Sequence, residues 1–460
     1  MKKLILLITC LIGFLAPKVL GQTYIQSWIS SPDTKKMLYR EEDHLLSDKA
    51  FSFPSIELFP QQKFQTIDGF GFTLTGSSAQ MIESLPKAQE DQLLHELFQL
   101  EDDGIGISVL RLSIAASDMD EEIFDYCEKS NDLKLETFSL KRDQKYLIPL
   151  LLKIKKIQPG IKLIAAPWSP PAWMKTNNST KGGELKADYY GLYANYLVKY
   201  LQEMKKLGLP IYAFSPQNEP LHPGNNPSLF MPAKSQAEFI KNHLGPALET
   251  AKLTSKIIVY DHNCDKPEYP IEILNDPKAK KYVFGSAFHL YNGDISAMST
   301  VKKAHPDKEL FFTEQWTGVK GEFAGDFNWH IKNVVIGSLK NHSRTALEWN
   351  ISNDPELKMH SPGGCTECLG ALTIGKSVLA RNQGYYIIAQ ASKFIPTNSI
   401  RINSSELPGI QQVAVQRPDG SFALLIQNET GKDQDLTIKI NNRFAHVFVP
   451  KNSTTSHIIL

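Results

Sequence analysis

The stretch Ile211-Tyr-Ala-Phe-Ser-Pro-Gln-Asn-Glu-Pro220 places an Asn-Glu pair directly after an apolar run. Four largely apolar residues end at Ser-Pro, and Pro220 blocks a regular continuation, so a short buried strand running into a loop is predicted. The stretch Glu309-Leu-Phe-Phe-Thr-Glu-Gln-Trp316 has the same form, with Glu314 where its apolar run ends. Glycoside hydrolysis requires two such carboxyl groups, one as proton donor and one as nucleophile or base. Taken singly, each glutamate is better explained as a solvated surface residue.

Outward from these two stretches, apolar strand-like runs alternate with helix-like segments. Alternation at this spacing predicts parallel pairing, and eight units close a (β/α)8 TIM barrel of the α/β class. Glu219 follows the fourth predicted strand and Glu314 the seventh, and active sites on such barrels lie at the C-terminal strand ends. Both carboxylates are therefore expected at one mouth. The eight strands are predicted near Ile67, Ile107, Ile161, Ile211, Lys256, Val283, Leu310 and Ala346.

The end of the chain has a different pattern, with short strand-like runs separated by turns such as Pro-Asp-Gly and Asn-Asn. This pattern predicts a small antiparallel β-sandwich as a side domain. Residues 22–65 contain further short alternating pieces and are expected to join it. The predicted organisation is a signal peptide at 1–21, an N-terminal segment at 22–65, a catalytic barrel at 66–395 and a C-terminal sandwich domain at 396–460.

The charge balance narrows the classes of partner. The 460 residues include 50 basic and 49 acidic ones, which gives a formal net charge of +1. So balanced a chain has no long-range field that would attract nucleic acid or anionic lipid. We expect a neutral carbohydrate substrate, a β-glucan or β-glucoside, and no nucleic-acid partner. The sequence leaves the oligomeric state open.

The first residues have the pattern of an export signal. Met1-Lys-Lys3 is basic, Leu4 to Leu15 is apolar but short for a bilayer span, and Gly21 offers a small residue for cleavage before Gln22. A secreted or periplasmic protein is predicted, with lipidation at Cys10 as a minor alternative. No later stretch reaches eighteen apolar residues, so stable membrane insertion is not expected.

Four cysteines remain after the predicted cleavage. Cys365-Thr-Glu-Cys368 has the spacing of a zinc or redox half-site, but no second ligand pair follows, and in an exported chain a local disulfide is favoured. Cys127 and Cys264 cannot be paired from the sequence. The histidines His262, His289 and His330 do not have the usual spacing of metal ligands, so no metal and no cofactor is predicted.

Ordered motifs from about Phe64 to the end resemble glycoside hydrolase family 30, the clan-A retaining enzymes that include glucosylceramidase and the β-1,6-glucanases. Many motifs in one order make the resemblance specific, whereas any single motif would be weak. The motifs are Asp68-Gly-Phe-Gly, Gly104-Ile-Gly, Leu110-Arg-Leu112, Ala116-Ser-Asp118, the run from Ala166 to Asn177, Gln217-Asn-Glu-Pro220, Phe288-His-Leu-Tyr291, Phe312-Thr-Glu314, Glu348-Trp-Asn350 and Ser392 to Pro396.

The resemblance implies roles for the residues around the reacting bond. Glu219 matches the acid/base glutamate and Glu314 the nucleophile. Asn218 matches the residue that contacts the sugar 2-hydroxyl. Arg111 and Tyr291 match the groups that hold the nucleophile ionised and oriented, Arg111 by its charge and Tyr291 by a hydrogen bond.

Further residues match the walls of a glucose pocket. Asp118 and Trp168 match the pair that binds the far hydroxyls, Trp349 matches the aromatic floor and His289 a histidine of the wall. Without the resemblance, the better interpretation would be a core aromatic for Trp349, a core histidine for His289 and a structural salt bridge for Arg111.

The resemblance also predicts the mechanism. Carboxyl groups on the fourth and seventh strands of such a barrel should lie about 5 Å apart, which predicts hydrolysis with retention. Glu219 should carry the acid proton, and the negative charge of Glu314 is expected to raise the pKa of Glu219.

The chain departs from the glucosylceramidases where Glu348 stands in place of their aspartate and in the loop of residues 351–368. This loop resembles that of members acting on β-1,6-glucan, so this substrate is predicted, with glucosylceramide as the alternative. A non-catalytic sugar-binding barrel is a third interpretation, and the presence of both glutamates argues against it.

Overall fold

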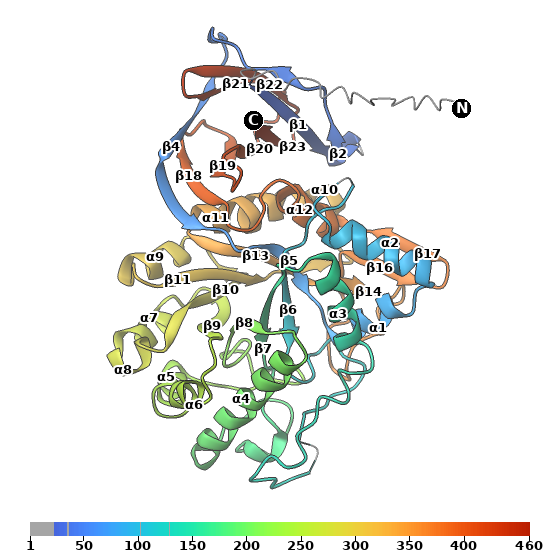
Figure 1. Cartoon of the computed structure of the whole chain (residues 1–460), viewed down its shortest axis with the longest axis vertical. Coiled ribbons are helices and arrows are strands. Elements are labelled where there is room, and N and C mark those ends of the chain that lie inside the picture. The colour runs from blue at the N-terminus through green and yellow to red at the C-terminus, as the bar shows by residue number, and fades with distance from the viewer. Residues whose placement is uncertain (1–22, 35, 102, 128) are drawn as a thin grey trace, which may run out of the picture.

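The computed structural model describes residues 23–34, 36–101, 103–127 and 129–460. The predicted signal peptide at 1–21 lies outside these residues. Eight parallel strands close into a barrel in the order β10-β11-β13-β5-β6-β7-β8-β9 (Figure 1). The predicted α/β barrel is therefore confirmed. Its strands are β5 (Gly69–Thr73), β6 (Val109–Ser113), β7 (Lys162–Ala166), β8 (Ile211–Phe214), β9 (Lys256–Cys264), β10 (Val283–Gly293), β11 (Glu309–Glu314) and β13 (Ser343–Asn350).

The barrel forms because its strands are apolar on both faces. Every residue of β5 and β6 is buried, as expected for parallel strands that are covered by helices outside and by one another inside. The interior is packed with side chains, not open. Seven buried residues, one each from seven of the eight strands, form this inner cluster: Val109, Ile164, Ala213, Ile258, Ala287, Phe311 and Leu347.

Amphipathic helices surround the barrel and bury their apolar faces against it. In α3, five residues including Leu147 and Ile154 are buried while Lys155 and Lys156 lie in the last turn, where cations interact favourably with the helix dipole. The helices are α1 (Gly76–Glu83), α2 (Lys87–Phe98), α3 (Leu147–Ile157), α4 (Tyr190–Lys206), α5 (Ala233–Phe239), α6 (Gly245–Thr250), α7 (Glu268–Asn275), α8 (Pro277–Lys280), α9 (Ala297–Ala304), α10 (Phe323–His330), α11 (Gly337–Lys340) and α12 (Gln383–Ser392).

A second body, built from both ends of the described chain, lies beside α11 and α12 (Figure 1). Strands from residues 24–66 pair with strands from residues 400–459 in one continuous set, and a separate apolar cluster that includes Ile25, Ile56, Leu424 and Ile438 fills it. The predicted β-sandwich is confirmed. Its strands are β1 (Tyr24–Ser31), β2 (Lys36–Arg40), β3 (His44–Leu45), β4 (Ser55–Thr66), β18 (Ile400–Ser404), β19 (Ile410–Gln416), β20 (Phe422–Asn428), β21 (Gln434–Ile440), β22 (Arg443–Val449) and β23 (Thr454–Ile459).

Short strands that the sequence pattern did not predict lie in the connections that follow β11 and β13. They have two to four residues each, too few to show an alternating pattern. They matter because they carry a long connecting loop across one end of the barrel. They are β12 (Thr317–Gly318), β14 (Ser352–Asn353), β15 (Cys368–Leu369), β16 (Leu372–Gly375) and β17 (Val378–Arg381).

A buried ion cluster joins four strands at the other end of the barrel, where the strands begin. Asp68, directly before β5, accepts two hydrogen bonds from Arg344 at 2.9 and 2.8 Å, one from Lys162 at 2.5 Å and one from the Tyr212 hydroxyl at 2.9 Å. Burial opposes ionisation, yet these cations lower the pKa of Asp68. Residues at this end of such barrels serve stability, so the Asp68-Gly-Phe-Gly motif is structural.

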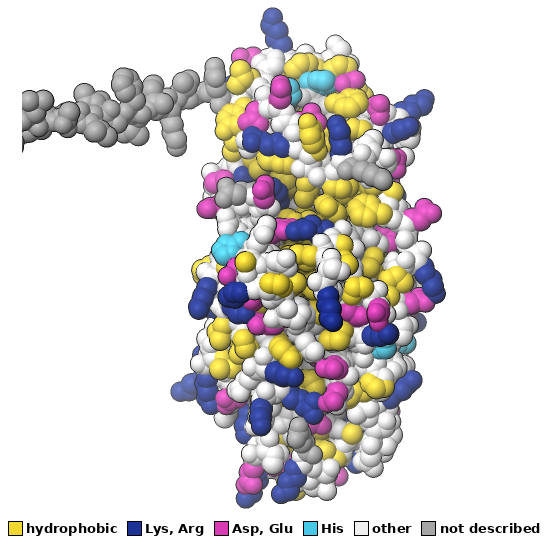
Figure 2. Space-filling view, turned by 90° about the vertical axis from the view of Figure 1, so that its right-hand side faces the viewer, with side chains coloured by type: hydrophobic (Ala, Val, Ile, Leu, Met, Phe, Trp, Pro, Cys, Tyr) yellow, Lys and Arg dark blue, Asp and Glu magenta, His cyan; other side chains and the backbone are white. Residues whose placement is uncertain are grey.

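The surface shows no one-sided charge. Figure 2 shows basic and acidic side chains interspersed with apolar ones over one face, in keeping with the net charge of +1. Among the residues that the structure describes, no helix has the length and apolar character needed to cross a membrane.

Candidate active site

A cavity of about 380 Å³ opens where the barrel strands end. Its wall contains both predicted glutamates and most of the other predicted site residues, which come from six different strands or the loops after them. The volume lies in the range typical of small-molecule sites. Arg111 and His289 lie behind this wall and are completely buried. The predicted residues on the wall are Asp118, Trp168, Asn218, Glu219, Tyr291, Glu314, Trp349, Cys365 and Cys368.

The loop after β8 holds Glu219 in an unusual backbone conformation. Its φ of 45° is left-handed, which a residue with a Cβ adopts only when the surroundings enforce it. The Glu219 N–H donates to the Asp261 carbonyl at 3.0 Å, and the Asn218 N–H donates to the Pro167 carbonyl at 2.8 Å. These bonds reach β9 on one side of β8 and the loop after β7 on the other. The loop is therefore fixed between two neighbouring strands, and the Glu219 carboxyl is aimed into the cavity.

Glu314, the last residue of β11, is held by two donors. Arg111 donates to Glu314 Oε2 at 2.5 Å, and the Tyr291 hydroxyl donates to Oε1 at 2.9 Å. Burial raises the pKa of Glu314, and the positive charges of His289 and Arg111 offset this only in part. With both oxygens engaged, one face of the carboxylate still reaches the cavity.

Asp261, in β9, is buried and contacts several site residues, and it was not predicted from the sequence. It accepts hydrogen bonds from Arg111 at 2.8 Å and from the Thr313 hydroxyl at 2.6 Å, and it lies 3.1 Å from His289 Nε2. Burial opposes its ionisation, but Arg111 and His289 hold the pKa of Asp261 well below its usual range. A signal was present, because Asp261 follows the apolar run Ile257–Tyr260 in the way that Glu314 follows its own.

His289 lies between three carboxylates. Its Nδ1 is 3.1 Å from Glu219 Oε1 and 3.7 Å from Glu314 Oε1, while its Nε2 faces Asp261. Burial disfavours the imidazolium, but Glu314, Asp261 and Glu219 together raise the pKa of His289 to about 9. The imidazole therefore carries a proton at neutral pH, and one nitrogen is within reach of both cavity glutamates.

The sequence-based prediction of a raised pKa for Glu219 is wrong in this structure. Burial does oppose ionisation, but the imidazole of His262, 3.7 Å from the carboxylate, and that of His289, hydrogen-bonded to it at 3.1 Å, outweigh it and lower the pKa of Glu219. The prediction considered only the negative charge of Glu314. It lacked the two imidazoles, which come from different strands and are brought against Glu219 by the barrel.

The same convergence brings two of the three histidines together, although their spacing in the sequence is not that of metal ligands. Ligand atoms of Glu219, His262 and His289 lie within 4.8 Å of one another, a spacing that a metal ion could bridge. His330 is elsewhere and pairs with Glu348, Nδ1 to Oε1 at 2.7 Å. This pairing also accounts for Glu348, which is buried behind the cavity wall and does not line it.

Two tryptophans and Asp118 form the opposite part of the cavity. The rings of Trp168 and Trp349 lie 5.4 Å apart, and the Arg111 guanidinium lies 5.0 Å from the Trp168 ring centre. Burial, with Glu314 nearby, raises the pKa of Asp118 to about 7. Aromatic faces beside a carboxyl group suit the apolar faces and hydroxyl edges of a sugar ring.

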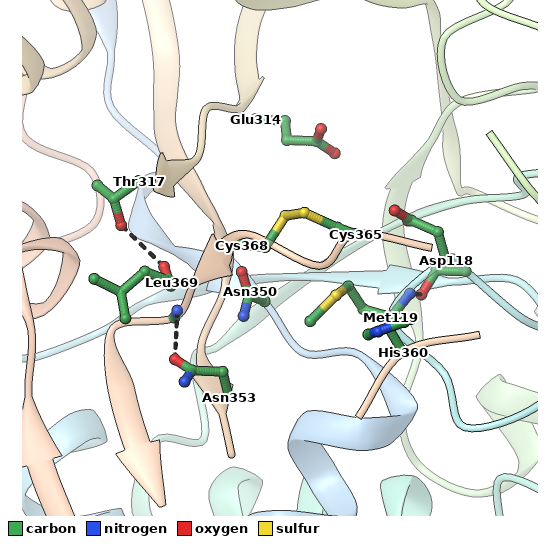
Figure 3. Close-up of a disulfide and its surroundings, with 12 residues drawn as sticks. Asp118, Met119, Glu314, Thr317, Asn350, Asn353, His360, Cys365, Cys368 and Leu369 are labelled. Carbon is green, nitrogen blue, oxygen red and sulfur yellow. Dashed lines mark hydrogen bonds between the residues drawn. A yellow bond between two sulfur atoms is a disulfide. The ribbon is translucent and has the colours of Figure 1, made fainter. Parts of the chain in front are cut away.

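Cys365 and Cys368 are joined in a disulfide at the cavity rim, with Asp118 on one side and Thr317 on the other (Figure 3). Cys127 and Cys264 are buried free thiols. The four cysteines of the described residues thus form one disulfide and two free thiols, and the disulfide lies at the site.

A (β/α)8 barrel with two glutamates facing one another at the ends of its fourth and seventh strands defines a class, the barrel glycoside hydrolases. The family model of the glycosyl hydrolase family 30 TIM-barrel domain matches residues 67–395, and that of the family 30 β-sandwich domain matches residues 398–456. The chain belongs to glycoside hydrolase family 30.

Named relatives fall into two groups. The chain is 32% identical over 406 residues, 84% of its length and 83% of the relative's, to an endo-1,6-β-D-glucanase of Neurospora crassa. It is 31% identical over 409 residues, 83% of its length and 79% of the relative's, to the lysosomal acid glucosylceramidase of Mus musculus. Among solved structures, it is similar to the endo-β-1,6-glucanase BT3312, with a TM-score of 0.90, 33% identity and coverage of 94% of this chain and 98% of that one.

Proposed function

We propose that this protein is an exported retaining hydrolase of β-glucosidic bonds that acts on β-1,6-glucan. The mechanism rests on one observation: His289 Nδ1 lies 3.1 Å from Glu219 Oε1 and 3.7 Å from Glu314 Oε1. This places the carboxyl groups close together, as a double displacement requires, because an inverting enzyme needs room for a water molecule between carboxylate and sugar.

In the proposed first step Glu314 attacks the anomeric carbon while Glu219 gives a proton to the leaving oxygen. The glucosyl group is then bonded to Glu314, and the aglycone leaves as an alcohol. In the second step Glu219 takes a proton from water while the water oxygen attacks the same carbon. The bond to Glu314 breaks, and the sugar is released with its original anomeric configuration. Arg111 and Tyr291 orient Glu314 through the two hydrogen bonds at its oxygens.

His289 supplies the proton that Glu219 needs. The imidazolium lies against the Glu219 carboxylate and is held on its other side by Asp261, so one proton is shared along this chain of groups. When a leaving oxygen approaches Glu219, the proton moves from His289 to the carboxylate and on to that oxygen. The hydrogen bond between His289 Nε2 and Asp261 keeps the imidazole oriented while the proton leaves from Nδ1.

This sharing predicts the pH dependence. Activity should rise as Glu314 ionises, above the ordinary carboxyl pKa of 4.5, and fall as the shared proton is lost near the His289 pKa of about 9. His289→Asn removes the imidazolium, so the alkaline limb of kcat/KM should move down by more than about one pH unit. His222→Asn, a histidine elsewhere on the cavity wall, is the control. An unmoved alkaline limb in His289→Asn would contradict the shared proton.

The proposed substrate is that of two named relatives, an endo-1,6-β-D-glucanase of Neurospora crassa and the endo-β-1,6-glucanase BT3312. The similarity to each extends over most of this chain and most of the relative. Export rests on the basic start and apolar run of the first 21 residues. Glucosylceramide is the second candidate, because the lysosomal acid glucosylceramidase of Mus musculus is also similar.

One experiment separates the two substrates. The purified protein is incubated separately with β-1,6-glucan, gentiobiose, laminarin, xylan and detergent-dispersed glucosylceramide, with Glu314→Gln as the inactive control, and products are followed in time. We expect mixed gluco-oligosaccharides from β-1,6-glucan. Glucose as the sole product from the start would mean exo action, and release of ceramide without action on the glucan would replace the proposal by its alternative.

A further inference from the structure

The loop between β14 and β15 forms one wall of the cavity. It runs from Asp354 to Glu367, and its later part contributes Gly363, Gly364 and Cys365 to the cavity lining. Figure 3 shows the disulfide within this wall, between Asp118 and the start of β15. Neither the family resemblance nor the mechanism above assigns the disulfide a role in the reaction.

The later part of this loop is attached to the backbone of Asp118. The Ser361 N–H donates to the Asp118 carbonyl at 3.1 Å, and the Ser361 hydroxyl donates to the Asn226 carbonyl at 2.9 Å. A Cβ on Gly364 would lie 2.2 Å from the Asp118 carbonyl oxygen, so only glycine permits this approach. Asp118 therefore depends for its position on a loop more than two hundred residues further along the chain.

The C-terminal end of the loop, where it enters β15, is attached behind Glu314. Cys368 and Leu369 form β15, which pairs with β12, and β12 begins at Thr317, just after the strand that ends in Glu314. The Thr317 hydroxyl donates to the Leu369 carbonyl at 2.9 Å (Figure 3). This end is thus bound to the frame that carries Glu314.

The disulfide links these two attachments within one wall of the cavity, with 5.7 Å between the two Cα atoms. Cys365 follows the glycine that touches Asp118, and Cys368 begins β15. Both cysteines pack in a small apolar cluster with the indoles of the cavity, Trp168, Trp316 and Trp349. The disulfide closes this short segment on itself, in addition to the hydrogen bond that the Val319 N–H donates to the Glu367 carbonyl at 3.0 Å.

We propose that the Cys365–Cys368 disulfide is a positioning element of the sugar site: it holds Asp118 at a set distance from Glu314 and closes the apolar wall beside the tryptophans. The inference rests on the proposed function of the cavity. A dithiol reductant would break it by giving two electrons and two protons, which leaves two thiols and an oxidised reductant. Because Glu219 and Glu314 are held by the barrel strands and not by this loop, loss of the disulfide should weaken binding more than it slows the chemical step.

The test compares wild type with Cys365→Ser/Cys368→Ser on gentio-oligosaccharides. We expect KM to rise about tenfold with kcat changed less than about twofold. The thermal midpoint should change little, since the disulfide closes a short loop. Dithiothreitol should produce the same KM change in folded wild type, reoxidation should reverse it, and the double variant should not respond. Indole emission should rise on reduction, because the disulfide that quenches Trp316 and its neighbours is removed.

A double-mutant cycle with Asp118→Asn separates positioning from general structure. If the disulfide acts through Asp118, its loss should have little further effect on KM once Asp118 is replaced. Additive effects, equal losses in kcat and KM, or an unchanged KM in both the double variant and reduced wild type would each overturn the inference and leave the proposed function intact. A wild type that hydrolyses no β-glucoside would instead overturn the proposed function.

Discussion

Replacing Glu314 with Gln should lower kcat for a 2,4-dinitrophenyl β-glucoside by roughly 10⁵-fold, the scale on which nucleophile removal acts in other covalent mechanisms. The amide keeps the shape of the side chain and the contact to Tyr291, but it cannot form the glucosyl ester. Steady-state kinetics measures the loss. Glu348→Gln is the matched control, since that buried glutamate pairs with His330 behind the cavity, and it should keep most of the activity.

The identity of the nucleophile has a second, stereochemical readout. In Glu314→Ala, azide can occupy the vacated space and attack from the face opposite the leaving group, so the product should be the α-glucosyl azide. In wild type, a 2-fluoro-glucoside should label Glu314, and peptide mapping locates the label. A label on another residue, or an inverted first product from wild type, would overturn the assignment.

Replacing Glu219 with Ala should have an effect that depends on the leaving group. An alkyl or sugar leaving group needs a proton, so its kcat/KM should fall by about 10³–10⁴-fold, whereas a 2,4-dinitrophenyl group leaves unaided and its first step should fall by less than about tenfold. The measurement is a plot of rate against leaving-group pKa, which should become steeper in the variant. Equal losses for all leaving groups would show that Glu219 is not the acid.

Azide again distinguishes the roles. In Glu219→Ala the glucosyl enzyme still forms on Glu314, and azide fills the space of the lost carboxyl and attacks the intermediate, so the β-glucosyl azide is expected. His262 and His289, which contact Glu219, remain in place and serve as the internal check that the cavity is intact. An α-glucosyl azide from this variant would exchange the assigned roles of the two glutamates.

Much of the architecture could be predicted from local patterns. The eight barrel strands were expected close to where they lie, because parallel strands covered on both faces must be continuous apolar runs, and helices between them must be amphipathic. Glu219 and Glu314 were found by the same logic, since each stands where such a run ends and barrel geometry brings those ends together.

Asp261 shows where this reasoning stopped. It also follows an apolar run, as Glu314 does, but the observed strand β9 continues past it to Cys264, and its place after a run does not show what the carboxylate contacts. Its importance lies in contacts with Arg111, Thr313 and His289, three residues from three other strands. Contacts between side chains of different strands cannot be read from any single stretch of sequence.

The sequence by itself determined the fold class, the sandwich at the chain end, the two glutamates and the local Cys365–Cys368 pair, because each depends on neighbours a few positions apart or on a strand count. Only the tertiary structure decided which groups surround Glu219 and which loop contacts the backbone of Asp118. Those depend on the imidazole of His289 meeting three carboxylates, and on the 354–367 loop docking against the backbone of Asp118. Electrostatic interactions act through space over a few ångströms, so they are set by which distant segments the barrel brings together.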